Sequence, residues 1–436
     1  MIINFIIAFY FVFNVYCQPN YNSPYTLFGL GDLTYSSHSQ GKSMGYTSIS
    51  LFSKRYINSD NPSSTFLIDT LSFIVDFSTL TTYISQKSTT QKANFLNVNF
   101  DFFGFGFPIT KIFKASLGIT PFSNIGYNIK EEKYIDTIFS INRYSGDGNL
   151  SKFFFNLSLK LYEFNKKNYS QSFIVGIQPW LLFGNTIDQT NVSFPNSKPS
   201  YSLNIRNKRN FLGFNARTSF TYLISFFNKY KSCFFTVLLE PKTNIHYNNY
   251  NIFLKQITVL GNLFSDTINE ESIAKNKLFY PGLLGFGFSY FSKNQFIFTA
   301  EYKFQRWSKS IINDVKLDNF EFVGMGIEYT PSPDKYVNYL SSINYRIGLF
   351  YSRTYYNINS YQIKEVGITL GFGLPLIKAV KGEPTSIRLK PPPIINVFFS
   401  FSKRGTTSYS LIKENFINFG VNFNLYDIWF LKRKYD

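Results

Sequence analysis

The stretch Asn415–Phe430, close to the end of the chain, contains a run in which apolar and polar residues alternate strictly. Every second residue from Ile417 to Leu425 is apolar, and the residues between them are asparagine or glycine. Side chains on a strand alternate between its two faces, so this stretch predicts a strand with one apolar face and one narrow, polar face. An edge strand of a soluble sandwich usually carries charges or proline in its middle. This stretch carries neither, which favours pairing on both sides.

The same alternation recurs at regular intervals along the chain. A membrane barrel places apolar residues outside and polar residues inside around its whole circumference. The pattern therefore predicts an all-β fold, a transmembrane antiparallel β-barrel of about fourteen strands, with sixteen as the alternative. The apolar face of Phe95–Phe107 switches near Phe102 and Phe103, which predicts a bulge. The candidate strands are Leu71–Thr82, Phe95–Phe107, Phe113–Thr120, Phe153–Leu161, Phe173–Phe183, Phe211–Phe226, Cys233–His246, Ile252–Phe264, Leu283–Phe291, Phe296–Trp307, Phe320–Thr330, Ile343–Tyr355, Ile363–Phe372, Ile394–Ser402 and the closing stretch.

Within the closing stretch, Asn418, Gly420, Phe423 and Leu425 follow the order polar, glycine and two alternating apolar residues. This order resembles the signal that the outer-membrane assembly machinery reads on the last strand of a barrel. An aromatic cluster and a basic tail over residues 431–436 follow it. The assembly machinery is therefore a predicted partner.

Composition supports crossing a membrane by strands. Aromatic residues make up 20% of the chain and charged residues 16%, and the mean hydropathy of -0.09 is too low for a helical membrane protein. Strands favour aromatic residues, and barrels carry aromatic girdles at both interfaces. The formal net charge is +18, but Lys and Arg are spread through the chain and form no run on a helix face. We expect no nucleic-acid partner, and the excess charge suits the anionic headgroups of a lipid bilayer.

The first seventeen residues predict a cleaved signal peptide. Ile2–Tyr16 is an apolar run too short for a comfortable spanning helix, and Val15 and Cys17 suit cleavage before Gln18. A lipoprotein acylated at Cys17 is the weaker alternative, because Tyr16 is bulky. The cysteines, Cys17 and Cys233, give no disulfide framework. The predicted location is the bacterial outer membrane.

Residues 18–69 differ from the rest, being rich in Ser, Asn, Tyr, Gly and Pro with weak alternation. Fifty residues with little regular structure are uncommon unless they are functional, so we expect a plug or hatch folded into the lumen of a barrel over residues 70–430. Gly41-Lys42-Ser43 lacks the upstream glycine of a phosphate-binding loop. Short links with proline are expected on the periplasmic side, and long polar loops near 130–150, 185–200 and 265–277 on the outer side. The segment Lys378–Pro393 fits neither class.

Residues for chemistry are scarce. The two histidines, His38 and His246, are far apart, so we expect no catalytic site, no metal site and no cofactor. Charged residues lie on the polar faces of predicted strands: Glu301 and Lys303 share one face with Gln305, and Arg346 lies on the polar face of its own strand. These side chains could brace the plug or meet a substrate carboxylate; the alternative is ordinary wall electrostatics. Arg353 has the opposite parity, nearer a rim.

Several motifs, in order, resemble the FadL-type family of outer-membrane transporters for hydrophobic compounds, in particular its Bacteroidota relatives. Asn61-Pro62-Ser63 stands where that family has Asn-Pro-Ala in its plug, with Ser63 as the departure. The other motifs are Ser23-Pro24-Tyr25 with Phe28-Gly29-Leu30-Gly31-Asp32, Gly41 to Gly45, Ala300–Ser308 ending in Trp-Ser, Arg404-Gly405-Thr406 with Leu411–Asn415, and the Trp429 to Lys434 end.

The resemblance implies a fourteen-stranded barrel closed by an N-terminal hatch, and passive movement of long-chain fatty acids or aromatic hydrocarbons. A hydrophobic small molecule is therefore an expected ligand. Other barrels of the superfamily act as accessories in secretion or barrel assembly. Two hypotheses follow: a passive transporter gated by the plug, and a non-conducting structural or assembly barrel that binds protein partners. A lumen filled by plug and loops, with a broad exposed apolar patch on the loops, favours the second. An apolar pocket at the outer mouth, continuous with a gap in the wall, favours the first.

Overall fold

The computed structural model describes residues 23–35, 39–136, 138–196, 200–226, 230–259, 262–292, 295–312, 315–332, 339–376 and 392–429. The predicted signal peptide, the basic tail, Cys17 and His38 lie outside these ranges, as does most of Lys378–Pro393. Among the described residues, no helix is both long and apolar enough to cross a membrane.

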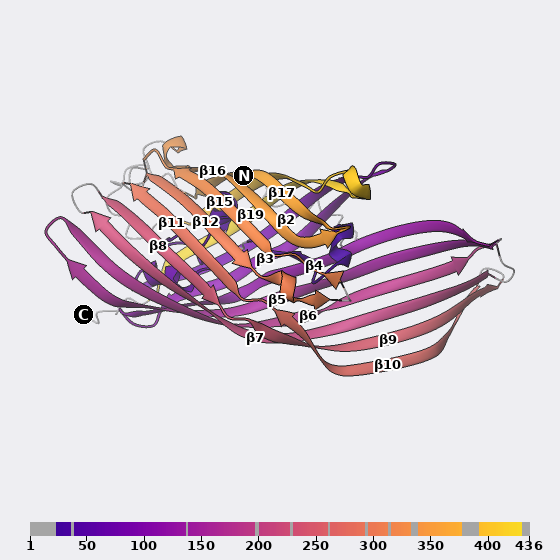
Figure 1. Ribbon diagram of the computed structural model, residues 1–436. Coiled ribbons are helices and arrows are strands. Elements are labelled where there is room, and N and C mark those ends of the chain that lie inside the picture. The colour runs from indigo at the N-terminus through magenta and orange to yellow at the C-terminus, as the bar shows by residue number, and fades with distance from the viewer. Residues whose placement is uncertain are drawn as a thin grey trace.

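Fourteen antiparallel strands close into a barrel (Figure 1), as the alternation predicted. Each strand pairs with its neighbour in the ring, and β19 closes the ring against β2, from Lys413 opposite Lys87 to Ile428 opposite Ser72. The ring strands, in order, are β2 (Ser72–Lys87), β3 (Lys92–Pro108), β4 (Phe113–Ile135), β5 (Ile138–Asn165), β6 (Tyr169–Phe194), β7 (Ser200–Phe226), β8 (Lys231–Glu240), β11 (Leu283–Ser292), β12 (Phe296–Gln305), β15 (Phe320–Tyr329), β16 (Asn344–Ile358), β17 (Tyr361–Pro375), β18 (Ile394–Arg404) and β19 (Lys413–Ile428).

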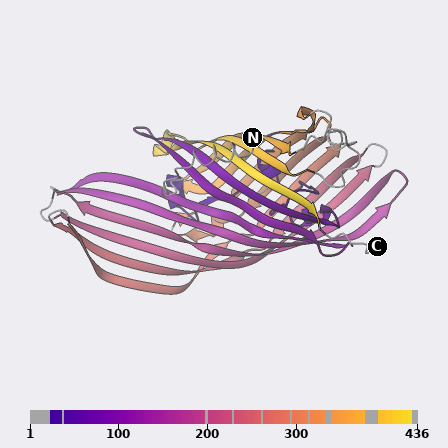
Figure 2. The same ribbon diagram turned by 180° about the vertical axis from the view of Figure 1, so that it is seen from behind.

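A second sheet region extends beyond one end of the barrel. The hairpin of β9 (Thr243–Val259) and β10 (Asn262–Tyr280) pairs with the first half of β7, and the long strands β4 to β7 run out alongside it (Figures 1 and 2). We call the six outer strand portions the projecting sheet. The expectation of long polar loops near 130–150, 185–200 and 265–277 was therefore wrong: strand pairing continues through most of these stretches. These stretches are polar on both faces of the strand, because the projecting sheet extends beyond the barrel wall. The alternation of apolar and polar residues that marks a membrane strand is therefore absent from them.

The two ends of the barrel differ. The end of β19 and the start of β2 lie at one end, which we call the termini end, with the prolines Pro108, Pro331 and Pro375 at or beside its links. The projecting sheet lies at the opposite end, which we call the hairpin end. Barrels in outer membranes have short periplasmic turns and longer outer connections, so the hairpin end has the features of the outer side.

The faces of the strands follow the pattern read from the sequence. On β19, Phe423 and Leu425 are 43% and 52% exposed, whereas Asn422 and Asn424 are each 1% exposed. The exposed residues point away from the barrel, and the buried asparagines point into it. The same apolar-outside order holds on β15, β16 and β17, where Met325, Leu349 and Ile368 are exposed. An apolar exterior around a polar interior suits a wall surrounded by lipid.

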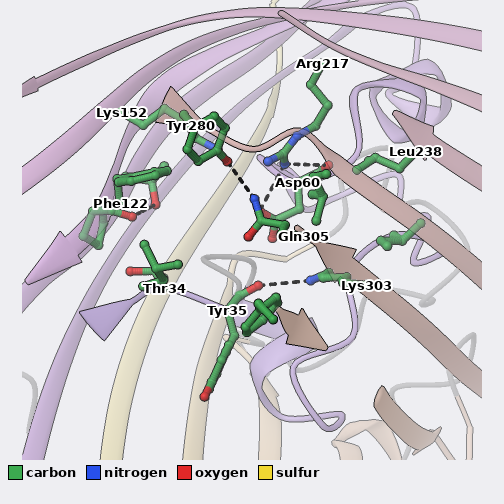
Figure 3. Close-up of a pocket in the computed structure, with 16 residues that line it drawn as sticks. Thr34, Tyr35, Asp60, Phe122, Lys152, Arg217, Leu238, Tyr280, Lys303 and Gln305 are labelled. Atoms are coloured by element: carbon green, nitrogen blue, oxygen red, sulfur yellow. Dashed lines mark hydrogen bonds and ion pairs between the residues drawn. The ribbon is translucent and has the colours of Figure 1, made fainter. Parts of the chain in front are cut away.

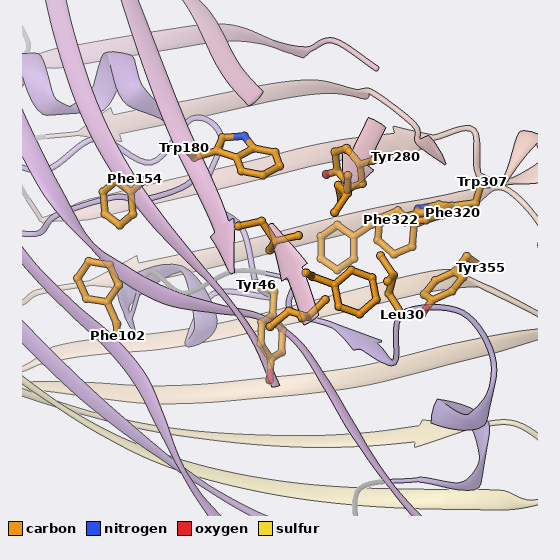
Figure 4. Close-up of a cluster of buried hydrophobic side chains, with 14 of the residues drawn as sticks. Leu30, Tyr46, Phe102, Phe154, Trp180, Tyr280, Trp307, Phe320, Phe322 and Tyr355 are labelled. Atoms are coloured by element: carbon orange, nitrogen blue, oxygen red, sulfur yellow. The ribbon is translucent and has the colours of Figure 1, made fainter. Parts of the chain in front are cut away.

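The lumen holds the N-terminal part of the chain. It contains the 3-10 turns η1 (Pro24–Leu27) and η2 (Pro62–Leu67), the two-residue strand β1 (Asp32–Leu33) paired with β4, and the single helical turn α2 (Ser39–Lys42). We call residues 39–69 the lumen segment. An apolar cluster, including Trp180, Tyr280 and Phe322, packs inside the wall near residues 30–46 (Figure 4). The remaining short elements are η4 (Trp307–Lys309), β13 (Ile311–Ile312), β14 (Val315–Lys316), η5 (Leu340–Ser342) and η7 (Ser408–Ser410).

Candidate functional site: the occupied lumen

Asn61, Pro62 and Ser63 form the start of η2 and hold the lumen segment in shape. The Asn61 side chain accepts a hydrogen bond from the backbone N–H of Ser63 at 3.0 Å and donates one to the carbonyl oxygen of Ile49 at 2.5 Å. Asparagine is a favoured N-cap, and proline at the first helical position has no N–H to leave unpaired. The Asn-Pro pair therefore sets a turn and ties it to the chain twelve residues earlier.

Ser63 touches the barrel wall directly. Its backbone N–H donates to Ser219 Oγ at 2.9 Å, and its hydroxyl lies 2.7 Å from Thr221 Oγ1 on β7. The neighbouring strand presents Gly176, whose added Cβ would overlap the backbone of Pro62 and Ser63. Position 176 must therefore be glycine for the turn to lie this close, and Ser63 itself is fully buried, so a larger side chain there would displace its neighbours. This contact gives a physical reason for the small residue that the motif requires.

Glu301, Lys303 and Arg346 all point into the lumen and contact the N-terminal part of the chain. Glu301 Oε2 accepts the backbone N–H groups of Ser48 and Ile49 at 2.6 and 2.7 Å. Lys303 Nζ lies 2.8 Å from Glu301 Oε1 and donates to the carbonyl oxygen of Tyr35 at 3.0 Å.

Arg346 pairs with Glu328 at 2.5 Å on the neighbouring strand, and Glu328 also accepts from Gln40 at 2.7 Å. Arg353, as its parity predicted, faces outward and is exposed. The structure thus brings the three lumen charges onto the plug side of the wall, where every one of them has a protein partner.

A second set of charges was missed in the sequence. Lys42, in α2, forms a buried ion pair with Asp101 on β3. Asp101 is the extra residue of a bulge, since Ser78 and Thr79 on β2 face Phe102 and Phe100. The predicted bulge near Phe102 is therefore present, one residue earlier, and it aims a carboxylate at the lumen segment. The lysine of the Gly-Lys-Ser stretch is thus held by a carboxylate of the wall.

Arg404, near the end of β18, joins the N-terminal residues to the hairpin end of the wall. Its guanidinium holds both carboxylate oxygens of Asp32, at 2.7 and 3.0 Å, and its Nε donates to Glu414 at 2.8 Å. A bidentate pair of this kind fixes geometry as well as charge. Asp32 stands in the Gly-Asp of an N-terminal motif, and Arg404 in the Arg-Gly-Thr motif near the other end. Their partnership was not readable, because 372 residues separate them.

At one place the backbone of the wall lies directly against the backbone of the lumen segment, with no side chain between them. Gly45 has a left-handed φ of +70°, and a Cβ on Gly348 of β16 would overlap the Gly45 nitrogen. Thr369 Oγ1 on β17 accepts the Gly45 N–H at 2.8 Å. Beside it, Tyr46 hydrogen-bonds Ser400 at 3.0 Å, and burial raises the pKa of its phenol to about 12. The end of the Gly41–Gly45 stretch therefore packs against β16 and β17.

Little open space remains inside. One cavity of about 70 Å³ is lined by charged residues that include Asp60, Lys152 and Arg217 (Figure 3). Arg217 pairs there with Glu240 at 2.6 Å and donates to the Asp60 carbonyl oxygen at 3.1 Å. A second cavity of about 160 Å³ is lined by Lys42, Asp101, Asp32, Glu365 and Arg404 among others. Apolar residues such as Leu33 and Phe320 line both cavities as well. Ligand pockets usually measure about 300–1,000 Å³, so each cavity is smaller than a usual ligand pocket.

The residues of the predicted assembly signal lie on both faces of β19. Phe423 and Leu425 point outward, and Asn418 donates to Ser400 Oγ at 2.9 Å. A Cβ on Gly420 would overlap the Phe398 ring, which gives the glycine a packing role. Recognition by the assembly machinery stays a prediction. His246 is exposed on β9, and no group of three metal-ligating side chains occurs within the described ranges.

The chain matches one protein family by sequence and a second group of proteins by fold. A family model described as BamG matches residues 1–436. The chain belongs to the BamG family. No curated protein sequence matches it. Outside the BamG family, the likeness is one of fold, to solved hydrocarbon channels of the FadL type, and it agrees with the resemblance read from the motifs.

Three solved structures illustrate that fold. A Pseudomonas aeruginosa FadL homologue has a TM-score of 0.55 at 12% identity, covering 91% of this chain and 98% of its own. The P. putida toluene transporter TodX gives 0.52 at 11%, covering 92% and 100%. The CymD monoaromatic hydrocarbon channel gives 0.51 at 8%, covering 89% and 96%. This BamG-family protein is therefore an antiparallel β-barrel with the FadL-type fold.

Proposed function

We propose that the protein is a non-conducting accessory barrel that serves the outer-membrane assembly machinery. The observation that carries the proposal is the occupied lumen. Residues 39–69 bond to inward-facing side chains on opposite parts of the ring, including Asp101 of β3, Thr221 of β7, Glu301 of β12 and Thr369 of β17. Contacts on so many sides support a lumen that this segment keeps closed.

Moving the lumen segment to open the barrel would cost free energy, because buried ion pairs would break. Breaking a buried ion pair by removing one partner typically costs about 3–5 kcal/mol, and the lumen segment and residues 23–35 share several such contacts with the wall. Moving the segment would expose Lys42–Asp101, Glu301 and its two amides, and Arg217 near Asp60 at the same time. An apolar substrate gives no compensating contacts to these charges. The interior thus supports a permanent seal better than a gate for hydrocarbons.

The projecting sheet gives the proposal a surface for protein partners. It lies beyond the barrel (Figures 1 and 2), and the first part of β10 and the last part of β4 have no ladder partner on their outer sides among the described strands. Unpaired edges can accept a strand from another chain. Charges such as Glu131 and Glu132 on the β4 edge limit unselective pairing.

A second candidate is passive transport of hydrophobic or amphipathic molecules such as fatty acids, with the lumen segment as the gate. One observation favours it: an apolar groove of about 850 Å³ on the outside of β15 to β19 also reaches Phe350, Gly367 and Phe416, which face inward. The groove thus involves residues of both faces of the wall. In both proposals the protein is not an enzyme.

A reversible lock on the lumen segment separates the two proposals. Ser63→Cys with Thr221→Cys, in a Cys233→Ser background, places two thiols where hydroxyl oxygens now lie 2.7 Å apart, within reach of a disulfide. Uptake of a labelled fatty acid and of toluene into liposomes is measured with the lock oxidised and reduced, beside protein-free liposomes. The accessory proposal expects no uptake above the protein-free level in either state.

Uptake by the reduced protein that stops on oxidation would instead establish a gated channel. In cells, depletion of the protein should lower the amount of folded outer-membrane barrels, and the locked variant should restore it fully. Failure of the locked variant to restore it, or unchanged barrel levels on depletion, would contradict the accessory role.

A further inference from the structure

A row of basic side chains crosses the outside of the wall near the hairpin end. Arg353 on β16 stands opposite Lys364 on β17, and Lys413 on β19 stands opposite Lys87 on β2. Between these two pairs, Lys403 on β18 stands opposite Val366, two residues further along β17 than Lys364. Lys92 on β3 stands opposite Lys87. We call these six residues the basic belt. Neighbouring strands are about 4.8 Å apart, so the belt spans about 24 Å of the circumference.

All six side chains point away from the lumen. Each shares its strand parity with an exposed apolar residue: Lys364 with Val366, Lys403 with Phe401, and Lys413 with Ile417. The inward positions between them hold Glu365, Arg404 and Glu414, which belong to the lumen network. The belt charges are therefore separate from the charges that hold the N-terminal part of the chain.

The belt has almost no acidic partners. Among the described residues, the only belt residue in an ion pair is Arg353, whose guanidinium lies 3.3 Å from Glu321 of β15. The hairpin links at 88–91, 359–360 and 405–412 contain no acidic residue. Like charges directly opposite each other across a strand pair are destabilising. Three like-charged pairs are nonetheless present here, Arg353–Lys364, Lys413–Lys87 and Lys87–Lys92. Only Arg353 has an acidic partner among the described residues of the wall, so an anion from outside would relieve the remaining repulsion.

An apolar groove lies directly below the belt. It measures about 850 Å³ and is lined by Met325, Leu349, Tyr351, Ile368 and Ile417, with Lys403 and Asn415 at its edge. Tyr351 and Tyr83, two and four positions from Arg353 and Lys87, are exposed at this level, as in the aromatic girdle at a membrane interface. Cations above an apolar groove at the interface match an amphiphile with an anionic headgroup and acyl chains.

We propose that the basic belt and its groove bind a phosphorylated lipid of the outer leaflet, lipid A, with its phosphates between the belt residues and an acyl chain in the groove. Two features favour lipid A over a phospholipid. The belt spreads several cations across six strands, which suits a headgroup with more than one phosphate. It also lies at the hairpin end, which has the features of the outer side. The site is independent of the proposed role in assembly.

The test compares lipid binding by the full-length protein in detergent, followed by native mass spectrometry. The belt variant carries Lys364→Gln, Lys403→Gln and Lys413→Gln. The control variant removes the same charge from exposed positions on the projecting sheet, Lys208→Gln, Lys255→Gln and Lys277→Gln. The probes are bis-phosphorylated lipid A, dephosphorylated lipid A and phosphatidylglycerol. We expect the apparent Kd for lipid A to rise at least tenfold in the belt variant and less than twofold in the control variant.

For the wild-type protein, removing the phosphates or substituting phosphatidylglycerol should weaken binding at least tenfold. Equal binding of phosphatidylglycerol would show a general anionic-lipid surface and overturn the assignment to lipid A. Equal loss in the two triple variants would also overturn it.

The thermal midpoint of unfolding, measured with and without lipid A, tests the same site independently. Without lipid and at low salt, Lys413→Gln should not lower the thermal midpoint, because it relieves the repulsion from Lys87. Added lipid A should raise the midpoint of the wild type more than that of the belt variant. A lower lipid-free midpoint for Lys413→Gln, or equal shifts with lipid A, would count against the site.

Discussion

Glu301→Gln is the most informative single change in the lumen, because one buried carboxylate holds two backbone amides and a lysine. The variant keeps the shape and can still accept from Ser48 and Ile49. It removes the charge that Lys303 Nζ meets at 2.8 Å. Both side chains are less than a tenth exposed, and leaving one member of a buried pair unpaired costs about 3–5 kcal/mol. We expect a loss near the lower bound, because the carbonyl oxygen of Tyr35 still accepts from Lys303.

The assay is amide hydrogen exchange of a peptide containing Ser48 and Ile49, on purified protein in detergent. A loss of about 3 kcal/mol corresponds to roughly a hundredfold faster exchange through local opening. Adding Lys303→Met to Glu301→Gln removes both charges and should bring exchange back to within about tenfold of wild type, since replacing a whole buried pair is often close to neutral.

Glu131→Gln is the matched control. Glu131 pairs with Lys133 at 3.6 Å on the projecting sheet with both side chains about half exposed, and exposed pairs contribute about 0–1 kcal/mol. It should leave the exchange of Ser48 and Ile49 unchanged. Exchange in Glu301→Gln within threefold of wild type, or a double variant worse than the two single changes combined, would refute the account of this carboxylate.

Four further outcomes follow from the contacts. Gly348→Ala should lower the thermal midpoint by more than Gly213→Ala, because its Cβ would meet the Gly45 backbone whereas position 213 meets only the Ile245 side chain; equal midpoints would contradict the close approach. Asp32→Asn should speed proteolysis within residues 23–35 and leave residues 39–69 protected, since Arg404 keeps Glu414; equal cleavage in both regions would show that they move together. Ser63→Ala should cost about 1–3 kcal/mol in denaturant unfolding, because the buried hydroxyl bonds both Asn61 and Thr221 and each hydrogen bond is worth about 0.5–1.5 kcal/mol; Ser63→Leu should cost more, because the position is fully buried and a larger side chain would displace its neighbours, and a tolerated leucine would contradict this. The pKa of Tyr46 is about 12 in the folded protein and about 10 in an unfolded chain, so its contribution to stability is complete below pH 10 and is lost as the pH rises towards 12; Tyr46→Phe should lose less midpoint over that range, and an identical loss would contradict the assignment.

The strand pattern was readable because it is local. Side chains alternate with a period of two, and lipid outside with polar groups inside gives each face its own composition. Ile417 to Leu425 therefore revealed both the strand and its outward face, and the same reading placed Glu301, Lys303 and Arg346 on the inner face. The Asn61-Pro62-Ser63 motif was visible for a related reason, because the cap that it forms depends on neighbouring residues.

The partners across the lumen were decided by closure of the barrel. Lys42 meets Asp101, and Asp32 meets Arg404, only because the fourteen strands curve around and return β19 to β2. No local periodicity records which inward side chains then face each other. The projecting sheet was hidden for a related reason: its strands have water on both faces, so the contrast between faces that marks a membrane strand is absent. The register of the strands, the curvature of the wall and the contacts that fill the lumen depend on the closed ring. They cannot be read from the sequence of any single strand.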